Sequence, residues 1–155
     1  MISVYLGLAA CLYKANQSAI ITALAVGLVV LATYYASSVA FEMMSLAKSF
    51  NGSSNPLLRQ QLLAAGEGML ATYKGTAFDV SYILNAITLF IFSWVMLKER
   101  ERTFTRTTAL WGLASAALMI IPSTAGTIGL IFSLLSLVPW VVFSILIAGR
   151  MRKSQ

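Results

Sequence analysis

Long apolar runs, separated by short clusters of charged residues, occupy most of this 155-residue chain. Hydrophobic residues make up 59% of the sequence and charged residues 10%, a balance that would not keep a soluble domain of this size in solution. The runs continue for about twenty positions, which is the length of a helix that crosses a bilayer, and they lack the alternation of a barrel strand. We therefore expect an all-α, polytopic transmembrane helix bundle, with residues 1–155 forming one membrane domain.

Five segments have the composition of spans. The first is short, because thirteen residues cover only about 20 Å as a helix, against a hydrocarbon thickness of about 30 Å. A polar turn follows it, and Ser18 is expected to cap the second helix. The polar stretch 48–55 predicts the clearest loop. The expected spans cover approximately residues 1–13, 18–47, 76–97, 107–122 and 126–149.

Residues 56–74 have a different pattern, in which leucines and methionines recur every three or four positions between polar residues. Asn55-Pro56 supplies a helix cap with proline at the first helical position. The pattern predicts an extracytoplasmic amphipathic helix at the membrane interface. Gly66 and Gly68 weaken its middle by about 1 kcal/mol each, so it is expected to need a packing partner.

The basic residues predict how the chain crosses the membrane, because Lys and Arg accumulate on the cytoplasmic side. Lys and Arg together number 11, against 5 for Asp and Glu. If the 98–106 connection and the C-terminal tail are cytoplasmic, they and Lys14 hold eight basic residues, and only Lys48, Arg59 and Lys74 lie outside. This predicts an outside N-terminus and a cytoplasmic C-terminus. It also explains the positive charge without a nucleic-acid partner.

Metal-dependent and cofactor-dependent chemistry has little support in the sequence. There is no histidine, and Cys11 is the one cysteine, so the usual ligand sets for zinc, copper, iron–sulfur clusters and haem cannot be assembled from this chain. Phosphate-binding loops, nucleophile elbows and dinucleotide fingerprints are also missing. We expect no catalytic residues, no metal, no cofactor and no enzymatic activity.

A polar stripe follows the start of the third long span, and Asp79 is its most suggestive member, because a carboxylate inside an apolar helix is costly. In one interpretation Asp79 and Glu42 lie near the outer ends of their helices and share a proton or bind a cation. In the other, Asp79 stabilises its helix N-terminus and both acids are hydrated at the headgroup level. The candidate polar intramembrane site consists of Glu42, Asp79, Tyr82, Asn85 and Thr88.

Small residues in the last two spans predict close helix packing, because they let helix backbones approach one another. Candidate packing positions are Gly112, Ala116, Gly126, Gly129 and Ser133. Trp94 and Trp111 flank the basic connection, as is typical of aromatic anchors at a membrane interface.

Several short motifs carry a family resemblance over residues 63–153. They are Gly75-Thr-Ala-Phe-Asp79, Thr107-Thr-Ala-Leu-Trp-Gly-Leu113, Ile121-Pro122 and Ser136-Leu-Val-Pro-Trp140 before a basic end. Through them the chain resembles a bacterial family of uncharacterised small multi-pass membrane proteins. The resemblance implies a bacterial inner-membrane protein that lacks the family's first span, so that a second copy or another protein would complete the bundle. It implies no catalytic residues.

Two functions remain open from the sequence. The first is association, either as an accessory subunit of a larger membrane complex or as a homo-oligomer in the lipid bilayer. The second is a small-solute or ion carrier or channel that uses Asp79, Asn85 and Glu42.

Overall fold

The structure is a computed structural model that describes residues 2–73, 75–99 and 103–153. Its described residues form seven helices and no strand, which confirms the predicted all-α class. The helices are α1 (Ile2–Leu12), α2 (Gln17–Ser37), α3 (Ala40–Gly52), α4 (Pro56–Tyr73), α5 (Thr76–Lys98), α6 (Arg106–Leu118) and α7 (Gly126–Lys153).

Three helical stretches are long and apolar enough to cross a membrane, namely Gln17–Gly52, Pro56–Lys98 and Gly126–Arg152. Helix α1, with 11 residues, covers only about 16 Å. Helix α6 has 13 residues, or about 20 Å, and ends at Leu118, although the sequence predicted a span to residue 122. The early end has a local cause, because Pro122 cannot continue a helix and disfavours the helical conformation of the residue before it.

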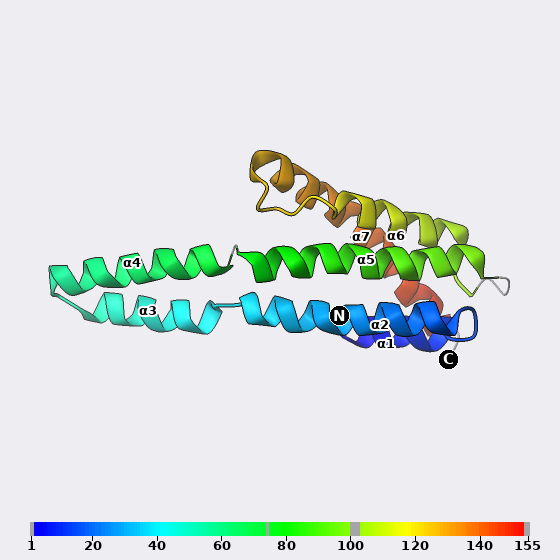
Figure 1. The fold of residues 1–155 in the computed structure, drawn as a ribbon, viewed down its shortest axis with the longest axis horizontal. Helices are drawn as coiled ribbons and strands as arrows, with labels where there is room; N and C mark the ends of the chain where they lie inside the picture. Colours follow the sequence, from blue (N-terminus) through cyan, green and yellow to red (C-terminus); the bar gives the residue numbers. More distant parts are fainter. Residues whose placement is uncertain (1, 74, 100–102, 154–155) are drawn as a thin grey trace.

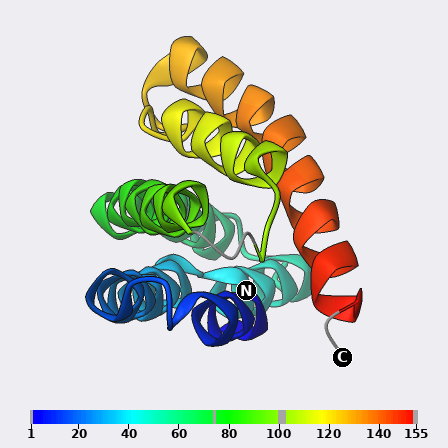
Figure 2. The same ribbon diagram turned by 90° about the vertical axis from the view of Figure 1, so that its right-hand side faces the viewer.

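The helices form two antiparallel rods with a helical hairpin on one side (Figure 1). Helices α2 and α3 follow one another along the first rod, and α4 and α5 along the second, so that α2 packs against α5 over its length. The α6–α7 hairpin packs on α5, and α1 packs on α2. Viewed along the rods, α7 crosses the bundle and its C-terminal end approaches α1 (Figure 2). The core lies where α1, α2, α5, α6 and α7 meet.

Helices α3 and α4 form a second, thinner hairpin that extends beyond the bundle (Figure 1). The sequence predicted one continuous helix over residues 18–47, and this was wrong at Ser38 and Val39. Ser38 is extended and its amide donates to the Tyr35 carbonyl, while the Ser37 hydroxyl donates to the Tyr34 carbonyl. Such local bonds compete with the helix.

Two local predictions about turns were also wrong. Helix α3 continues to Gly52, so only residues 53–55 of the expected 48–55 loop lie outside a helix. Asn16, and not Ser18, caps α2, because its side chain accepts from the Ala19 amide at 3.1 Å. The prediction for α4 is confirmed at its start, where the Asn55 side chain accepts from the Leu57 amide at 3.0 Å.

Helix α4 occupies the segment that predicted an interfacial amphipathic helix, but its direction differs from that expectation. It runs along the line of α5 and does not lie across the end of the bundle (Figure 1). It also remains helical through Gly66 and Gly68. Its packing partner is α3, so the two weakened turns are supported by a neighbouring helix.

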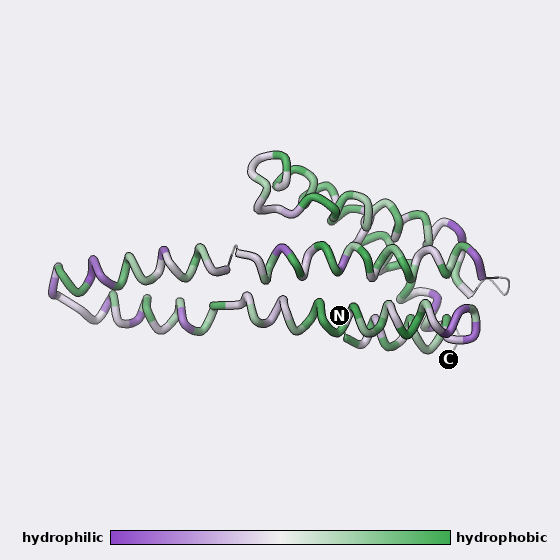
Figure 3. Tube along the Cα trace, in the orientation of Figure 1, coloured by the Kyte–Doolittle hydropathy of each residue, from purple (hydrophilic) through white to green (hydrophobic). Residues whose placement is uncertain are grey.

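Polar residues collect at the two ends of the molecule and apolar residues between them (Figure 3). The turn that contains Lys14, the end of α5 and the end of α7 lie together at one end of the bundle (Figure 1). The tip of the α3–α4 hairpin lies at the opposite end. The first end holds described basic residues that the sequence assigned to the cytoplasm, including Lys14, Lys98, Arg106, Arg150 and Arg152, whereas Lys74, Arg100 and Arg102 lie outside the described residues.

Candidate functional site

Buried polar side chains form a network that crosses the bundle from α1 to α7. The Tyr5 hydroxyl donates to Asn85 Oδ1, and Asn85 Nδ2 lies 3.8 Å from Met119 Sδ. Ser115 Oγ, from α6, lies 3.8 Å from the same sulfur and 3.4 Å from the Ser136 carbonyl oxygen of α7. The chain of contacts therefore connects α1, α5, the end of α6 and α7.

Two predicted site residues, Tyr82 and Thr88, contact neighbouring helices around this network. The Tyr82 hydroxyl lies 3.4 Å from Ser136 Oγ, which itself donates to the Ser133 carbonyl at 2.7 Å. Thr88 is fully buried, and its hydroxyl donates to the Leu84 carbonyl of its own helix at 2.9 Å. Its methyl group faces Gly27 of α2. Tyr82 thus belongs to the network, whereas Thr88 packs α5 against α2.

The structure separates Asp79 from Glu42. The Thr124 hydroxyl, in the connection between α6 and α7, donates to Asp79 Oδ1 at 2.5 Å. Glu42 is exposed on α3, beyond the break at the end of α2. Within the described part of the chain, no hydrogen bond joins the two carboxylates to each other or to a common partner. Asp79 therefore holds the start of α5 to the α6–α7 connection.

The hydrogen bonds of this arrangement join neighbouring helices. Asn85 is 9% exposed, and its amide oxygen and nitrogen both have partners from other helices. Buried polar groups that satisfy one another across helices hold a bundle together, because an unpaired group in an apolar interior is costly. Among the described residues no group of three or more His, Cys, Asp or Glu side chains is placed to hold a metal ion.

Gly112 lies where three helices meet. A Cβ atom at this position would come within 2.1 Å of Ser93 Oγ in α5 and 2.7 Å of the Phe143 ring in α7. Ala116, one turn later on α6, is 3% exposed. These two predicted packing positions both face the interior, and only a small residue fits at the first.

The other three predicted packing positions lie at the start of α7 and in its first turns. Gly126 has a φ of +67° and open space around it, so its role is to start α7 from a left-handed conformation. A Cβ on Gly129 would lie 2.1 Å from the Pro122 carbonyl oxygen, so this glycine fits α7 against its own entry turn. Ser133 is half-buried, and its carbonyl accepts from Ser136. A packing stripe on α7 thus stays a prediction, and the close approach that the structure describes there is that of Gly129 to the connection before the helix.

Sequence reasoning missed Tyr5, Gly27 and Met119. Tyr5 lies in the shortest apolar segment, yet it is 6% exposed and its ring stacks on Phe92 with centroids 6.1 Å apart. Gly27 makes room for that ring, since a Cβ there would lie 2.9 Å from it. One signal was available, because a lone tyrosine in an apolar helix needs a partner for its hydroxyl.

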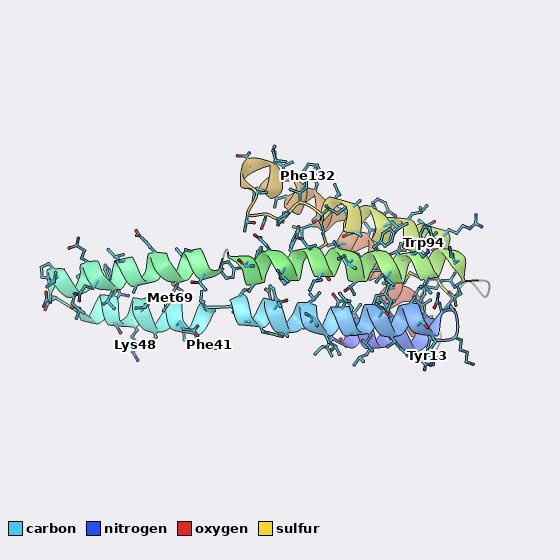
Figure 4. The ribbon with its side chains drawn as sticks, viewed as in Figure 1. Tyr13, Phe41, Lys48, Met69, Trp94 and Phe132 are labelled. Carbon is cyan, nitrogen blue, oxygen red and sulfur yellow. The ribbon has the colours of Figure 1, made fainter. Side chains whose placement is uncertain are left out.

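The α3–α4 hairpin has an apolar groove, which we call the hairpin groove. Its volume is about 280 Å³. It is lined by Met43, Leu46, Ala47, Phe50, Asn51, Leu62, Leu63, Gly66 and Leu70. A second hollow of about 300 Å³ continues from Met43 and Leu70 to Tyr34 and Tyr73, at the junction with the bundle. Phe41 and Lys48 lie on the side of α3 that faces away from α4 (Figure 4).

Comparisons with known proteins find no relative of this chain. No protein-family model matches it. No curated protein and no solved structure matches it either. Its function must therefore be argued from its own residues.

Proposed function

We propose that this protein is an integral membrane helix bundle that associates with a second copy of itself through the α3–α4 hairpin. The helices α1, α2, α5, α6 and α7 occupy the bilayer, with Lys14, the α5–α6 connection and the C-terminal end in the cytoplasm. The hairpin then extends on the outer side of the membrane. The observation that carries the proposal is the incomplete packing of this hairpin.

Neither α3 nor α4 contains a buried residue. Large apolar side chains are instead open on both helices, including Leu57 at 65% exposure and Leu63 at 57%. Two antiparallel helices bury too little apolar surface to be stable in water without further packing. Exposed apolar surface of this kind, when it is rimmed by polar residues, is typical of a protein–protein contact.

The hairpin groove fits another pair of helices. None of the residues that line it is charged. The guanidinium of Arg59 lies 4.1 Å from the centre of the Phe50 ring, so a partner must cover the groove and leave this cation at its edge, because burying it would be costly. Its floor includes Gly66, where an added Cβ atom would meet no other atom within 4 Å, which leaves room for an incoming side chain. Two helices with an apolar face on one side form half of a four-helix bundle.

A second copy is the occupant that the membrane favours. All copies of a membrane protein have the same orientation in the bilayer, so their hairpins extend on the same side and to the same height. A twofold axis along the membrane normal then brings two hairpin grooves face to face, and twofold symmetry is the most common symmetry of oligomers. An accessory role in a complex with a different membrane subunit is the competing form of association.

A carrier or channel for a small solute is the other function that the sequence left open. It would need Asp79, Asn85 and Glu42 around one pathway. Asn85 and Asp79 instead have separate partners in the bundle, and Glu42 lies on the hairpin. No described observation favours transport, so we do not propose it.

Two glycines of α4 provide a matched test. Gly66 lines the hairpin groove and Gly68 does not, and both lie in the same helix with open space around them. Replacing either glycine by glutamate improves helix propensity by a similar amount. Only Gly66→Glu places a charge in the proposed interface. We expect it to raise the dimer dissociation constant by about 100-fold or more, because an unpaired buried charge costs several kcal/mol.

The measurement is the mass of the intact particle in mild detergent by native mass spectrometry, with the dissociation constant from dilution. The wild type and Gly68→Glu should be dimers, and Gly66→Glu a monomer. A wild-type monomer would overturn the proposal, as would a dimer that Gly66→Glu leaves intact. If a different polypeptide is bound at fixed stoichiometry, the protein is an accessory subunit and the partner of the hairpin is not a second copy.

A further inference from the structure

A second groove, between α5 and α6, lies within the bundle and faces outward. We call it the α5–α6 groove. Its volume is about 410 Å³, within the range of about 300–1,000 Å³ that is common for small-molecule sites. Its lining is entirely apolar and consists of Ile83, Ala86, Ile87, Phe90, Leu113, Ala116, Ala117 and Ile120. Since these residues lie in the middle of the apolar part of the bundle, acyl chains are the medium that surrounds them in a bilayer.

The two walls of this groove continue toward the basic end of the bundle as helical stripes. On α5, Phe90 is followed one turn later by Trp94, whose ring stacks on the Phe90 ring with centroids 6.0 Å apart. Trp94 is 45% exposed and lies near the end of α5 (Figure 4). On α6, residue 110 continues the wall from residue 113 at helical spacing, and Leu110 is 58% exposed. The groove thus leads to the level where aromatic side chains meet lipid headgroups.

A basic residue lies at the end of each stripe, Lys98 on α5 and Arg106 on α6. Lys98 Nζ lies 4.7 Å from the centre of the Trp94 ring, so its ammonium group is held over the aromatic anchor. Arg106 is the first residue of α6 and is exposed. The N-terminus of α6 adds partial positive charge at the same point.

Neither cation has a carboxylate partner among the described residues. The nearest described acid in sequence is Glu99, and one of its oxygens accepts from the Thr103 hydroxyl within the α5–α6 connection. The other Glu99 oxygen is buried without a hydrogen-bond partner and makes no ion pair with either cation in the part of the chain that the structure describes. An external anion can therefore contact Lys98 and Arg106 directly. Basic sites between helices on the cytoplasmic side of a membrane are suited to acidic lipid headgroups.

From this juxtaposition we propose that the α5–α6 groove binds an anionic phospholipid of the cytoplasmic leaflet. One acyl chain lies along the groove past Phe90, and Trp94 is at the headgroup level. Lys98 and Arg106 hold the phosphate group. The proposal rests on the placement of the bundle in a bilayer and is independent of the pairing of hairpins, which lie at the other end of the molecule.

A transmembrane helix is a less suitable occupant of the same groove. A helix long enough to cross the bilayer would extend past Phe90 to the level of Lys98 and Arg106, and it would have to cover two cations that have no carboxylate partner among the described residues. Burying a charge without a partner is costly. A phospholipid avoids this cost, because its own phosphate meets the cations while its chain fills the apolar part.

The test compares phosphatidylglycerol with phosphatidylcholine of the same acyl chains. Full-length protein in mild detergent is titrated with each lipid, and bound lipid is counted by native mass spectrometry. We expect tighter binding of phosphatidylglycerol that weakens as salt is added, because salt screens exposed charges. The double variant Lys98→Gln/Arg106→Gln should lose this preference by roughly tenfold. The matched control Arg150→Gln/Arg152→Gln removes two cations from the same end and should keep it.

A second pair of variants tests the groove itself. Ala117 lines it and Ala114, on the same helix, does not, although both alanines are exposed. Ala117→Phe should weaken binding of both lipids, whereas Ala114→Phe should not. The fold of every variant is checked by circular dichroism.

Three outcomes would overturn the proposal. One is a wild-type protein without preference for the anionic lipid. Another is a preference that the Arg150/Arg152 control removes and the Lys98/Arg106 variant keeps. The third is a change of oligomeric mass in Ala117→Phe with unchanged lipid binding, which would make the groove a helix interface.

Discussion

Gly112 determines how closely α6 approaches its neighbours. A methyl group here would come within 2.1 Å of Ser93 Oγ and 2.7 Å of the Phe143 ring, so either α5 or α7 would have to move. The residue types alone indicated that a small residue belonged at this position. They did not identify what lies opposite, because Ser93 and Phe143 come from helices on either side of it in the chain.

We expect Gly112→Ala to lower the free energy of unfolding by about 1–2 kcal/mol, because overpacking costs more than the gain in helix propensity. The control is Gly149→Ala in α7, where no atom lies within 4 Å of the added methyl group. That variant should be neutral or slightly stabilised. The free energy of unfolding of both variants is measured in mixed detergent micelles. If Gly112→Ala were stabilised as much as Gly149→Ala, the close contact at Gly112 would be contradicted.

At the scale of elements, the short helix α1 is fixed in the bundle by contacts with other helices. Its 11 residues are too few to cross a bilayer. Tyr5 attaches the helix to α5 through its hydrogen bond to Asn85 and its ring contact with Phe92. At its opposite face, Gly7 meets the Met151 side chain, since a Cβ there would lie 2.3 Å from Met151 Cε. Helix α1, which packs mainly on α2, is therefore also held by α5 and by the end of α7.

Removal of the Tyr5 hydroxyl should loosen α1 in particular. We expect Tyr5→Phe to destabilise the protein by about 1 kcal/mol, because Asn85 is left with an unpaired oxygen. Backbone hydrogen exchange should increase mainly in α1. Tyr13→Phe is the matched control, because the Tyr13 hydroxyl accepts from Gln17, the first residue of α2, in an exposed local contact and has no bond to α5. Exchange that rises equally in both variants would show that the Tyr5–Asn85 bond does not hold α1.

The whole molecule has a basic end and a hairpin end, and this polarity predicts which segments share a side of the membrane. In a Cys11→Ser background, we expect Asn55→Cys at the tip of the hairpin to react with a membrane-impermeant maleimide in intact cells. Ala15→Cys and Gly149→Cys should react only after permeabilisation, because they lie at the basic end. Labelling of Asn55→Cys and Ala15→Cys from the same side would contradict the topology.

The sequence by itself determined the features that depend on neighbouring residues. Apolar runs set where most helices form, and Asn55 and Pro56 set the start of α4. The helix break at Ser38 is also local, but its signal is weak, because serine side chains bond the backbone both inside and outside helices.

Only the tertiary structure decided the remaining features, because they depend on pairs of residues distant in the sequence. The sequence marked Asn85 as a polar site candidate, but it did not show that Tyr5, eighty positions away, is its partner. The direction of the α3–α4 hairpin likewise follows from how α2 packs on α5, since each of its helices continues the line of one of them. A local pattern specifies which face of a helix is apolar, and packing specifies what that face meets.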